Sequence, residues 1–222
     1  MKAMILAAGR GERLRPITDT LPKPLVKVRG KPLIAWHLER LSAAGFREVV
    51  INVSHLGDLV EGAVGDGHDW GLRVAWSRES APLETAGGIA QALGLLGPAP
   101  FLLVNADVYC AVSFSALRRI ELDTRLGHLV MVPNPTFRPE GDFSLSEGRI
   151  GNGATPRYTY AGISVLAPLI VGNVVPGSKA PLGPLLRCAA DGGFLGGELY
   201  SGGWSDVGTP ERLAELNCVK AS

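Results

Sequence analysis

Cysteine is scarce in this chain of 222 residues, and the three cysteines are an odd number. Cys110, Cys188 and Cys218 are widely spaced, so no pair has the short spacing of a zinc site and no disulfide framework is indicated. Unpaired thiols of this kind are typical of proteins in a reducing compartment. The sequence therefore predicts a cytoplasmic protein without structural disulfide bonds.

Long hydrophobic runs are also missing. The apolar segment 3–8 is shorter than the core of a signal peptide, and Arg10 and Arg13 follow it at once. No segment approaches the roughly 20 consecutive apolar residues that a membrane-spanning helix needs. We therefore expect neither a secretory leader nor a membrane partner.

An excess of charge of either sign is absent too. Lys and Arg number 22 against 21 Asp and Glu, which gives a formal net charge of +1. Proteins that bind DNA or RNA usually carry a clear basic excess, so this balance argues against a nucleic-acid partner. A small basic pocket for one anionic ligand stays compatible with it. Hydrophobic residues make up 46% of the chain, which is typical of a folded globular domain.

Predicted strands and helices alternate along the chain. Apolar or alternating patterns predict strands at 3–8, 49–53, 72–77, 101–104, 129–132 and 158–166. Helical periodicity and capping residues predict helices at 31–44, 88–96, 114–122, 182–190 and 209–219. The alternation predicts an α/β fold with a mostly parallel central sheet. We expect one domain over residues 1–222, in which the Gly- and Pro-rich stretch 133–159 is an insertion or lid.

Polar and glycine-rich segments follow several of the predicted strands. In α/β sheets, ligands bind beyond the carboxyl ends of the strands. This rule brings segments 9–15, 87–88 and 105–107 to one rim of the sheet. We therefore expect the functional site at this rim.

The loop after the first strand combines glycines with cations. Gly9 and Gly11 let backbone N–H groups approach a phosphate closely, but the loop has neither the Lys-Ser/Thr pair of a Walker loop nor the third glycine of a dinucleotide fingerprint. Arg13 offers a forked donor for phosphate oxygens. Lys23 lies between two prolines, which fix the backbone around its ammonium group. The pattern favours an anion-binding loop; an ordinary turn with a solvated lysine is the alternative.

This loop resembles the signature of the sugar-1-phosphate nucleotidylyltransferases, the enzymes that make nucleotide-sugars; it reads GRGERLRPITDTLPKPL. The resemblance continues over nearly the whole chain, through LVKVRGKPLIAWHLERL, INVSHLG, LETAGGI, FLLVNADV, YAGISVL and WSDVGTPERL. These segments occur in the order of the family. The resemblance implies a three-layer, Rossmann-like nucleotide-diphospho-sugar transferase fold.

Within this family, the segments LETAGGI, GDFSL and WSDVGTPERL look most like those of the compact N-acetylmuramate α-1-phosphate uridylyltransferases of cell-wall recycling. The resemblance implies the reaction of UTP with N-acetyl-α-muramate 1-phosphate to give UDP-N-acetylmuramate and pyrophosphate. The alternatives are a related enzyme for glucose, mannose or another hexose 1-phosphate with dTTP or GTP and, from another class, a non-catalytic sensor of nucleotide-sugars. The expected partners are these small molecules, with the chain acting as a monomer or small homo-oligomer.

The resemblance also assigns roles to individual residues. It implies Arg13, Lys23 and Asp107 as catalytic residues, and Asp107 with Asp206 as ligands of Mg²⁺, an ion that carboxylates suit. About a hundred residues separate the two aspartates, so spacing alone does not show that they meet. The implied nucleotide-binding residues are Leu6, Ala8, Gly9, Gly11, Glu12, Arg13, Lys23, Gly88 and Asn105, and the implied sugar-binding residues are Asn105, Asp142 and Gly162.

One departure from the family pattern lies ahead of the strand 158–166. Many family members carry a Glu-Lys-Pro segment there, whose lysine grips the sugar phosphate, whereas this chain reads ATPRY at 154–158. Arg157 and Lys179 are the candidates to replace that lysine. Muramate also carries a lactyl carboxylate, for which Arg138, Arg149 and Arg157 are candidate partners.

Overall fold

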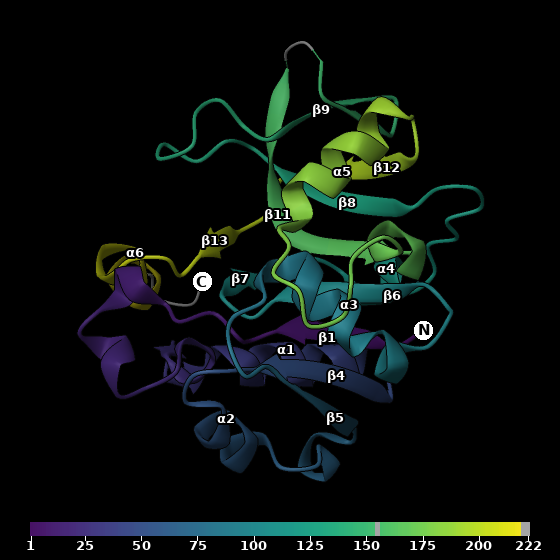
Figure 1. Cartoon of the computed structure of the whole chain (residues 1–222). Helices are drawn as coiled ribbons and strands as arrows, with labels where there is room; N and C mark the ends of the chain where they lie inside the picture. The colour runs from purple at the N-terminus through teal and green to yellow at the C-terminus, as the bar shows by residue number, and fades with distance from the viewer. Residues whose placement is uncertain (154–155, 219–222) are drawn as a thin grey trace.

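A sheet of nine strands forms the centre of the computed structural model, which describes residues 1–153 and 156–218 (Figure 1). The strands, in spatial order, are β5 (Arg73–Arg78), β4 (Glu48–Val53), β1 (Ala3–Leu6), β6 (Phe101–Asn105), β11 (Arg157–Leu166), β8 (Gly127–Val132), β12 (Leu195–Leu199), β10 (Arg149–Gly151) and β9 (Phe143–Ser146). Two further pairs lie apart from this sheet: β2 (Lys27–Val28) with β3 (Lys31–Pro32), and β7 (Val108–Cys110) with β13 (Trp204–Asp206).

The sheet is parallel in its first half and mixed beyond it. β5, β4, β1 and β6 all pair in parallel, with Ile5 opposite Ile51 on one side and Val104 on the other. β11 then runs antiparallel to both of its main neighbours, β6 and β8, and β9 and β10 form an antiparallel hairpin at the far edge. The expected parallel pairing therefore holds from β5 to β6 and again between β8 and β12, whereas β9 and β10, which a short turn connects, pair antiparallel.

Two apolar cores on opposite faces of the sheet give the fold three layers. β1 shows the division, since Ala3 and Ile5 face one core and Met4 faces the other, as strand alternation requires. The first core also takes in α1 (Leu33–Ala43), α2 (Gly57–Val64) and α4 (Phe114–Leu117), and the second takes in α3 (Glu84–Leu96) and α5 (Leu182–Asp191). This arrangement confirms the predicted α/β architecture.

Several predicted helix boundaries are wrong. α1 begins at Leu33 because residues 31–32 pair as β3, and α3 begins at Glu84 instead of residue 88. α4 stops at Leu117, five residues early, although Ser113 caps it as expected and its hydroxyl accepts a hydrogen bond from Ala116 N at 3.3 Å. α6 (Pro210–Cys218) matches the last predicted helix, whose expected end at residue 219 lies outside the described residues.

The stretch predicted as an insertion contributes to the central sheet. Within 133–159 the chain forms β9, β10 and the start of β11, apart from residues 154–155, which are not described. β9 pairs with β11 as well as with β10, so the hairpin extends the sheet at the end that Figure 1 shows uppermost. Its role as a lid stays a prediction. Within the described part of the chain, no helix combines the length and apolar character needed to cross a bilayer.

Candidate functional site

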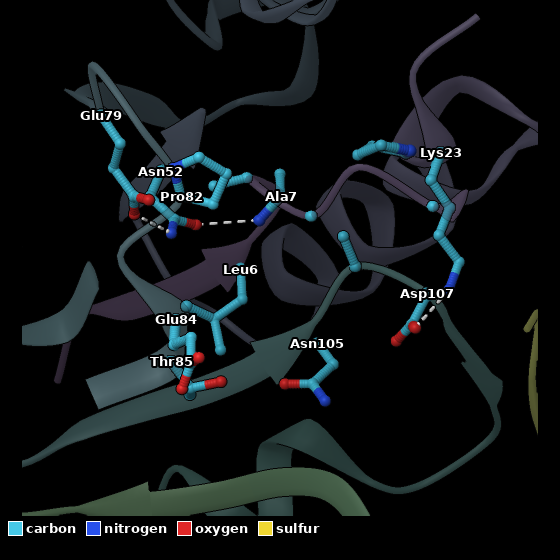
Figure 2. Close-up of a pocket in the computed structure, with 15 residues that line it drawn as sticks. Leu6, Ala7, Lys23, Asn52, Glu79, Pro82, Glu84, Thr85, Asn105 and Asp107 are labelled. Carbon is cyan, nitrogen blue, oxygen red and sulfur yellow. Dashed lines mark hydrogen bonds and ion pairs between the residues drawn. The ribbon is translucent and has the colours of Figure 1, made fainter. Parts of the chain in front are cut away.

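Three adjoining cavities lie along the carboxyl ends of β1, β4 and β6. The central chamber, of about 340 Å³, is lined by Leu6, Ala7, Ala8, Gly9, Gly11, Lys23, Pro24, Asn52, Glu79, Pro82, Glu84, Thr85, Asn105, Ala106 and Asp107 (Figure 2). The cationic chamber, of about 690 Å³, is lined by Arg10, Gly11, Glu12, Arg13, Lys23, Pro82, Lys179 and Gly208. The outer chamber, of about 390 Å³, is lined by Glu84, Thr85, Asn105, Arg138, Asp142, Phe143, Tyr160, Pro181, Leu182, Gly183, Leu186 and Arg187. Shared lining residues connect the central chamber to both others.

A buried polar chain supports one wall of the central chamber. Asn52 Oδ1 accepts a hydrogen bond from Ala7 N at 2.8 Å, and Asn52 Nδ2 donates to Glu79 Oε1 at 2.6 Å. Glu79 Oε2 accepts from Leu83 N at 3.0 Å. Figure 2 shows Glu79, Asn52 and Ala7 joined in this order. Because both side chains are buried and fully engaged, they fix the first loop and the start of α3 relative to each other.

Lys23 and Asp107 form the polar side of the central chamber. Lys23 opens the short 3₁₀ helix η3 (Lys23–Leu25), and its Nζ lies 2.5 Å from Asp107 Oδ2 (Figure 2). The side chains are only 12% and 30% exposed, so solvent screens this ion pair weakly. An anion in the chamber would meet the ammonium group at the point where it now touches the carboxylate.

The glycine loop reaches Lys23 because of Gly11. Gly11 has φ +65°, and a methyl group there would lie 2.9 Å from Thr18 Cγ2 and 3.3 Å from Lys23 Cβ. Thr18 Oγ1 donates to Gly11 O at 2.8 Å, which holds the turn closed. A larger residue would therefore strain the turn and separate the loop from the lysine.

The cationic chamber gathers positive charge. Arg10, Arg13, Lys23 and Lys179 line it, with Glu12 as its one acidic lining residue. Arg13 makes no ion pair with any of the described residues, whereas Lys179 Nζ lies 3.2 Å from Glu84 Oε1. Clustered cations around a cavity of this size suit a ligand with several negative charges.

The β7–β13 pair brings the two distant aspartates together. Asp206 lies opposite Val108 in the register, and Val207 N donates to Asp107 O at 2.8 Å. The Asp206 carboxylate accepts a hydrogen bond from the Arg212 guanidinium. Asp206 itself lines none of the three chambers, but Gly208, two residues on, lines the cationic chamber.

This pair of carboxylates suits a divalent cation that is shared with phosphate groups. Mg²⁺ is usually held by one or two protein carboxylates and completes its coordination with phosphates and water. Residues 1–153 and 156–218 contain no cluster of three or more His, Cys, Asp or Glu that could bind a metal without such help. Asp107 and Asp206 are the carboxylates at this rim that could hold such a cation together with phosphate groups.

Asp142 organises the outer chamber. Its Oδ2 accepts hydrogen bonds from Tyr160 N at 2.9 Å and from Arg138 Nη1 at 3.1 Å. Its backbone carbonyl accepts from Arg157 Nη2 at 2.6 Å and from Arg187 Nη1 at 3.3 Å. Burial raises the pKa of the Tyr160 hydroxyl above its usual range, so this group stays protonated and neutral. The chamber thus offers hydroxyl, amide, carboxylate and guanidinium groups to one ligand.

The structure separates the predicted site residues into lining and supporting positions. Gly88 and Gly162, predicted to bind nucleotide and sugar, line none of the three chambers. A methyl group on Gly88 would lie 2.7 Å from Glu79 Oε1, and one on Gly162 would lie 2.7 Å from Asn105 Nδ2, so both glycines make room for side chains that do line the site. The other predicted nucleotide and sugar residues line one or two chambers: Leu6, Ala8, Gly9, Gly11, Glu12, Arg13, Lys23, Asn105 and Asp142.

Sequence reasoning missed several lining residues. Asn52 interrupts the apolar run of β4 just before Val53, and a polar residue within a buried strand is a signal that could have predicted it. Glu79 and Arg187 carry no comparable local signal, because a charged residue in a loop or on a helix surface is ordinary. Of the proposed replacements for the missing lysine, Lys179 lines the cationic chamber and Arg157 binds the Asp142 backbone.

Comparisons with known proteins agree with this geometry. Residues 2–140 match the protein family described as nucleotidyl transferase. The N-acetylmuramate alpha-1-phosphate uridylyltransferase of Neisseria meningitidis serogroup B is 49% identical over 99% of this chain and 98% of that protein. A protein of the same name from Caulobacter vibrioides is 35% identical over 96% of this chain and 97% of that protein.

A solved structure has the same fold at low sequence identity. The crystal structure from Bacillus anthracis described as a glucose-1-phosphate thymidylyltransferase in complex with a sucrose superimposes with a TM-score of 0.84. The match covers 100% of this chain and 97% of that one, at 20% identity. The match therefore supports the fold, whereas substrate choice depends on the residues of the site.

Proposed function

The chain belongs to the sugar-1-phosphate nucleotidyltransferase family and has its nucleotide-diphospho-sugar transferase fold, and we propose that it makes UDP-N-acetylmuramate and pyrophosphate from UTP and N-acetyl-α-muramate 1-phosphate. We choose these two substrates because the chain is similar, over nearly its full length, to two N-acetylmuramate α-1-phosphate uridylyltransferases. The reaction would serve the recycling of peptidoglycan.

The three chambers accommodate the three parts of the reacting complex. The central chamber would take the nucleoside and the α-phosphate, the cationic chamber the β- and γ-phosphates, and the outer chamber the sugar. Asn105 lines both the central and outer chambers, where the sugar phosphate must meet the α-phosphorus. Holding both substrates in one cleft makes the reaction effectively intramolecular.

The chemistry requires charge stabilisation more than proton transfer. A phosphate monoester has a second pKa of about 6, so the sugar phosphate is mostly dianionic at neutral pH. One of its oxygens attacks the α-phosphorus of UTP, a new P–O bond forms, and the bond from the α-phosphorus to the bridging oxygen breaks to release pyrophosphate. Lys23 would stabilise the charge on the α-phosphoryl group, and Arg13 would hold the departing pyrophosphate.

Asp107 and Asp206 would hold Mg²⁺. Enzymes of this family generally use a divalent metal ion, which neutralises phosphate charge when bound. In the structure, Lys23 pairs with Asp107 and Arg212 pairs with Asp206. We expect Lys23 to exchange its carboxylate partner for the α-phosphate when UTP binds.

The direct test is a pyrophosphate-release assay with each of UTP, dTTP and GTP against N-acetylmuramate, glucose and mannose 1-phosphates. We expect product with UTP and N-acetyl-α-muramate 1-phosphate in the presence of Mg²⁺, and none after removal of the metal with EDTA. Turnover only with another nucleotide and hexose phosphate would identify a related transferase. Binding of nucleotide-sugar without any pyrophosphate release would identify a sensor.

Replacement of Lys23 or Asp107 tests the catalytic assignment. Lys23→Ala and Asp107→Ala should each slow turnover at least about 100-fold, because loss of a preorganised charge contact costs roughly 3 kcal/mol or more in the transition state. Far-UV circular dichroism should stay unchanged. Lys27→Ala, which removes an exposed lysine from β2, is the matched control and should retain full activity. Equal activity of Lys23→Ala and the control would remove Lys23 from the mechanism.

We also propose that the enzyme works in the cytoplasm as a monomer or small homo-oligomer, without a nucleic-acid or membrane partner. The balanced charge of the chain supports small anionic substrates as its partners.

A further inference from the structure

We propose that Arg187 of α5 binds the lactyl carboxylate of the muramate substrate in the outer chamber and so selects this sugar over neutral ones. The inference rests on the proposed function, because it assigns a specificity residue for the same reaction. Arg187 lies outside the stretch 133–159, which the sequence predicts as an insertion or lid. It lines the outer chamber because α5 packs against the edge of the sheet.

The charged side chains of the outer chamber are not evenly matched. They are Glu84, Arg138, Asp142 and Arg187. Asp142 pairs with Arg138 at 3.1 Å, and Glu84 pairs with Lys179 of the cationic chamber at 3.2 Å. Among the described residues, Arg187 alone of the four forms no ion pair. A neutral sugar would leave this positive charge without a counter-charge.

The Arg187 guanidinium is held in place by contacts that leave most of its donors free. Its Cζ lies 5.2 Å from the centre of the Phe143 ring, and Nη1 donates to the Asp142 carbonyl at 3.3 Å. A guanidinium group has five N–H donors, and only this one hydrogen bond is made within the described residues. Arg187 is an exposed residue, so these two contacts orient its guanidinium toward the chamber while most of its donors stay available to bind a carboxylate in a bidentate manner.

The substrate supplies the matching group. N-acetylmuramate differs from N-acetylglucosamine by a lactyl ether on O3, which adds one carboxylate. The sugar phosphate must lie toward Asn105, the residue shared with the central chamber, so the lactyl group can extend toward the opposite wall of the outer chamber. Arg138 also lines this chamber, but its guanidinium is already bound to Asp142. Arg187 is thus the better partner.

The test compares two proteins with two substrates. The proteins are the wild type and Arg187→Met, which keeps much of the side-chain volume but removes the charge. The substrates are N-acetylmuramate 1-phosphate and its analogue in which the lactyl carboxylate is a carboxamide of the same shape. We expect the wild type to prefer the carboxylate by about 10- to 100-fold in kcat/KM, the range for one charged hydrogen-bonded contact. The preference should vanish in Arg187→Met, mainly because KM for N-acetylmuramate 1-phosphate rises.

The remaining measurements separate the possible failures. KM for UTP should not change, and Arg119→Met, which removes an exposed arginine outside the chamber, should behave as the wild type. If Arg187→Met lowers kcat/KM equally for both substrates, Arg187 binds the sugar phosphate or maintains the shape of the chamber, and the inference is wrong. It is also wrong if the preference survives in the variant. If the wild type makes no product from N-acetylmuramate 1-phosphate, the proposed function fails instead.

Discussion

His37 is a titratable residue in the core whose chemistry the proposed reaction does not use. It lies on α1, almost completely buried, with its ring stacked on Phe114 at 6.4 Å between centroids. Burial, together with the positive charge of Arg40, lowers its pKa to about 4, and the negative charge of Asp107 acts in the opposite direction. The ring is therefore neutral in the folded chain at neutral pH, as a packed aromatic residue.

The buried His37 should make the fold sensitive to acid. The folded pKa lies below the unfolded value of 6.5, so the unfolded chain binds the extra proton first as the pH falls. The contribution of neutral His37 to the free energy of unfolding is fully present above pH 6.5. It is lost between pH 6.5 and 4, and amounts to about 3 kcal/mol for a pKa shift of this size. In urea unfolding with EDTA present, the free energy of unfolding should fall more steeply over this pH range for the wild type than for His37→Gln. Parallel profiles would contradict this account.

At the scale of one element, α3 shows how glycines in the same helix serve different purposes. Ala86 N and Gly87 N both donate to Ala180 O, so a distant loop caps the start of the helix. A methyl group on Gly87 would clash with the carbonyl oxygen of Ser178 in that loop. Gly94 lies on the exposed side of α3 with nothing within 4 Å of where a methyl group would be. The first glycine is required by packing, whereas the second is not.

Alanine at these two positions should shift stability in opposite directions. Gly94→Ala should raise the free energy of unfolding by about 0.5–1 kcal/mol, because alanine loses less conformational entropy in a helix. Gly87→Ala should lower it by about 1–3 kcal/mol, because the loop at 178–180 must move away. Urea unfolding monitored by circular dichroism measures both. A loss of stability in Gly94→Ala, or a gain in Gly87→Ala, would refute the distinction.

The boundaries of α3 and the missed strand β12 mark the limit of prediction from local sequence. The local pattern starts this helix at residue 88, because nothing nearby in sequence indicates that Ala180 caps residues 86 and 87. β12 contains Gly196 and Gly197, which weaken any strand signal. A methyl group on Gly197 would lie 2.6 Å from Ile150 Cδ1, so the glycine permits close packing with β10. The β1 and β6 strands were predictable because their apolar runs are continuous.

At the scale of the whole molecule, the last helix, α6, meets the N-terminal segment 14–33 beside the site. Leu14, Val28, Leu33 and Val207 form a small, fully buried core. Figure 1 shows α6 next to the N-terminal segment, and Arg29 N donates to Asn217 Oδ1 at 2.6 Å across this contact. Because Val207 follows Asp206 directly, the packing of this core also sets the position of the carboxylate.

Loosening this core should weaken metal binding while the fold remains. Val207→Ala removes buried methyl groups from the junction, at a cost of about 1–3 kcal/mol, and should free β13 from the N-terminal segment. We expect the Mg²⁺ concentration for half-maximal activity to rise several-fold, with circular dichroism unchanged. Val175→Ala is the control, because Val175 is 69% exposed and far from this core in the sequence. An equal response of the two variants would show that Val207 does not position Asp206.

The sequence alone determined the chemistry that the rim of the sheet offers. Continuous apolar runs define the strands, and Asn105 and Asp107 follow one of them, so their place at the carboxyl ends follows from local pattern. Only the tertiary structure decided which partners they have. The meeting of Asp107 with Asp206, and of Arg187 with the outer chamber, depends on strand order and helix packing between residues far apart in the chain. Local periodicity does not encode such pairings, because many of them satisfy the same hydrophobic pattern.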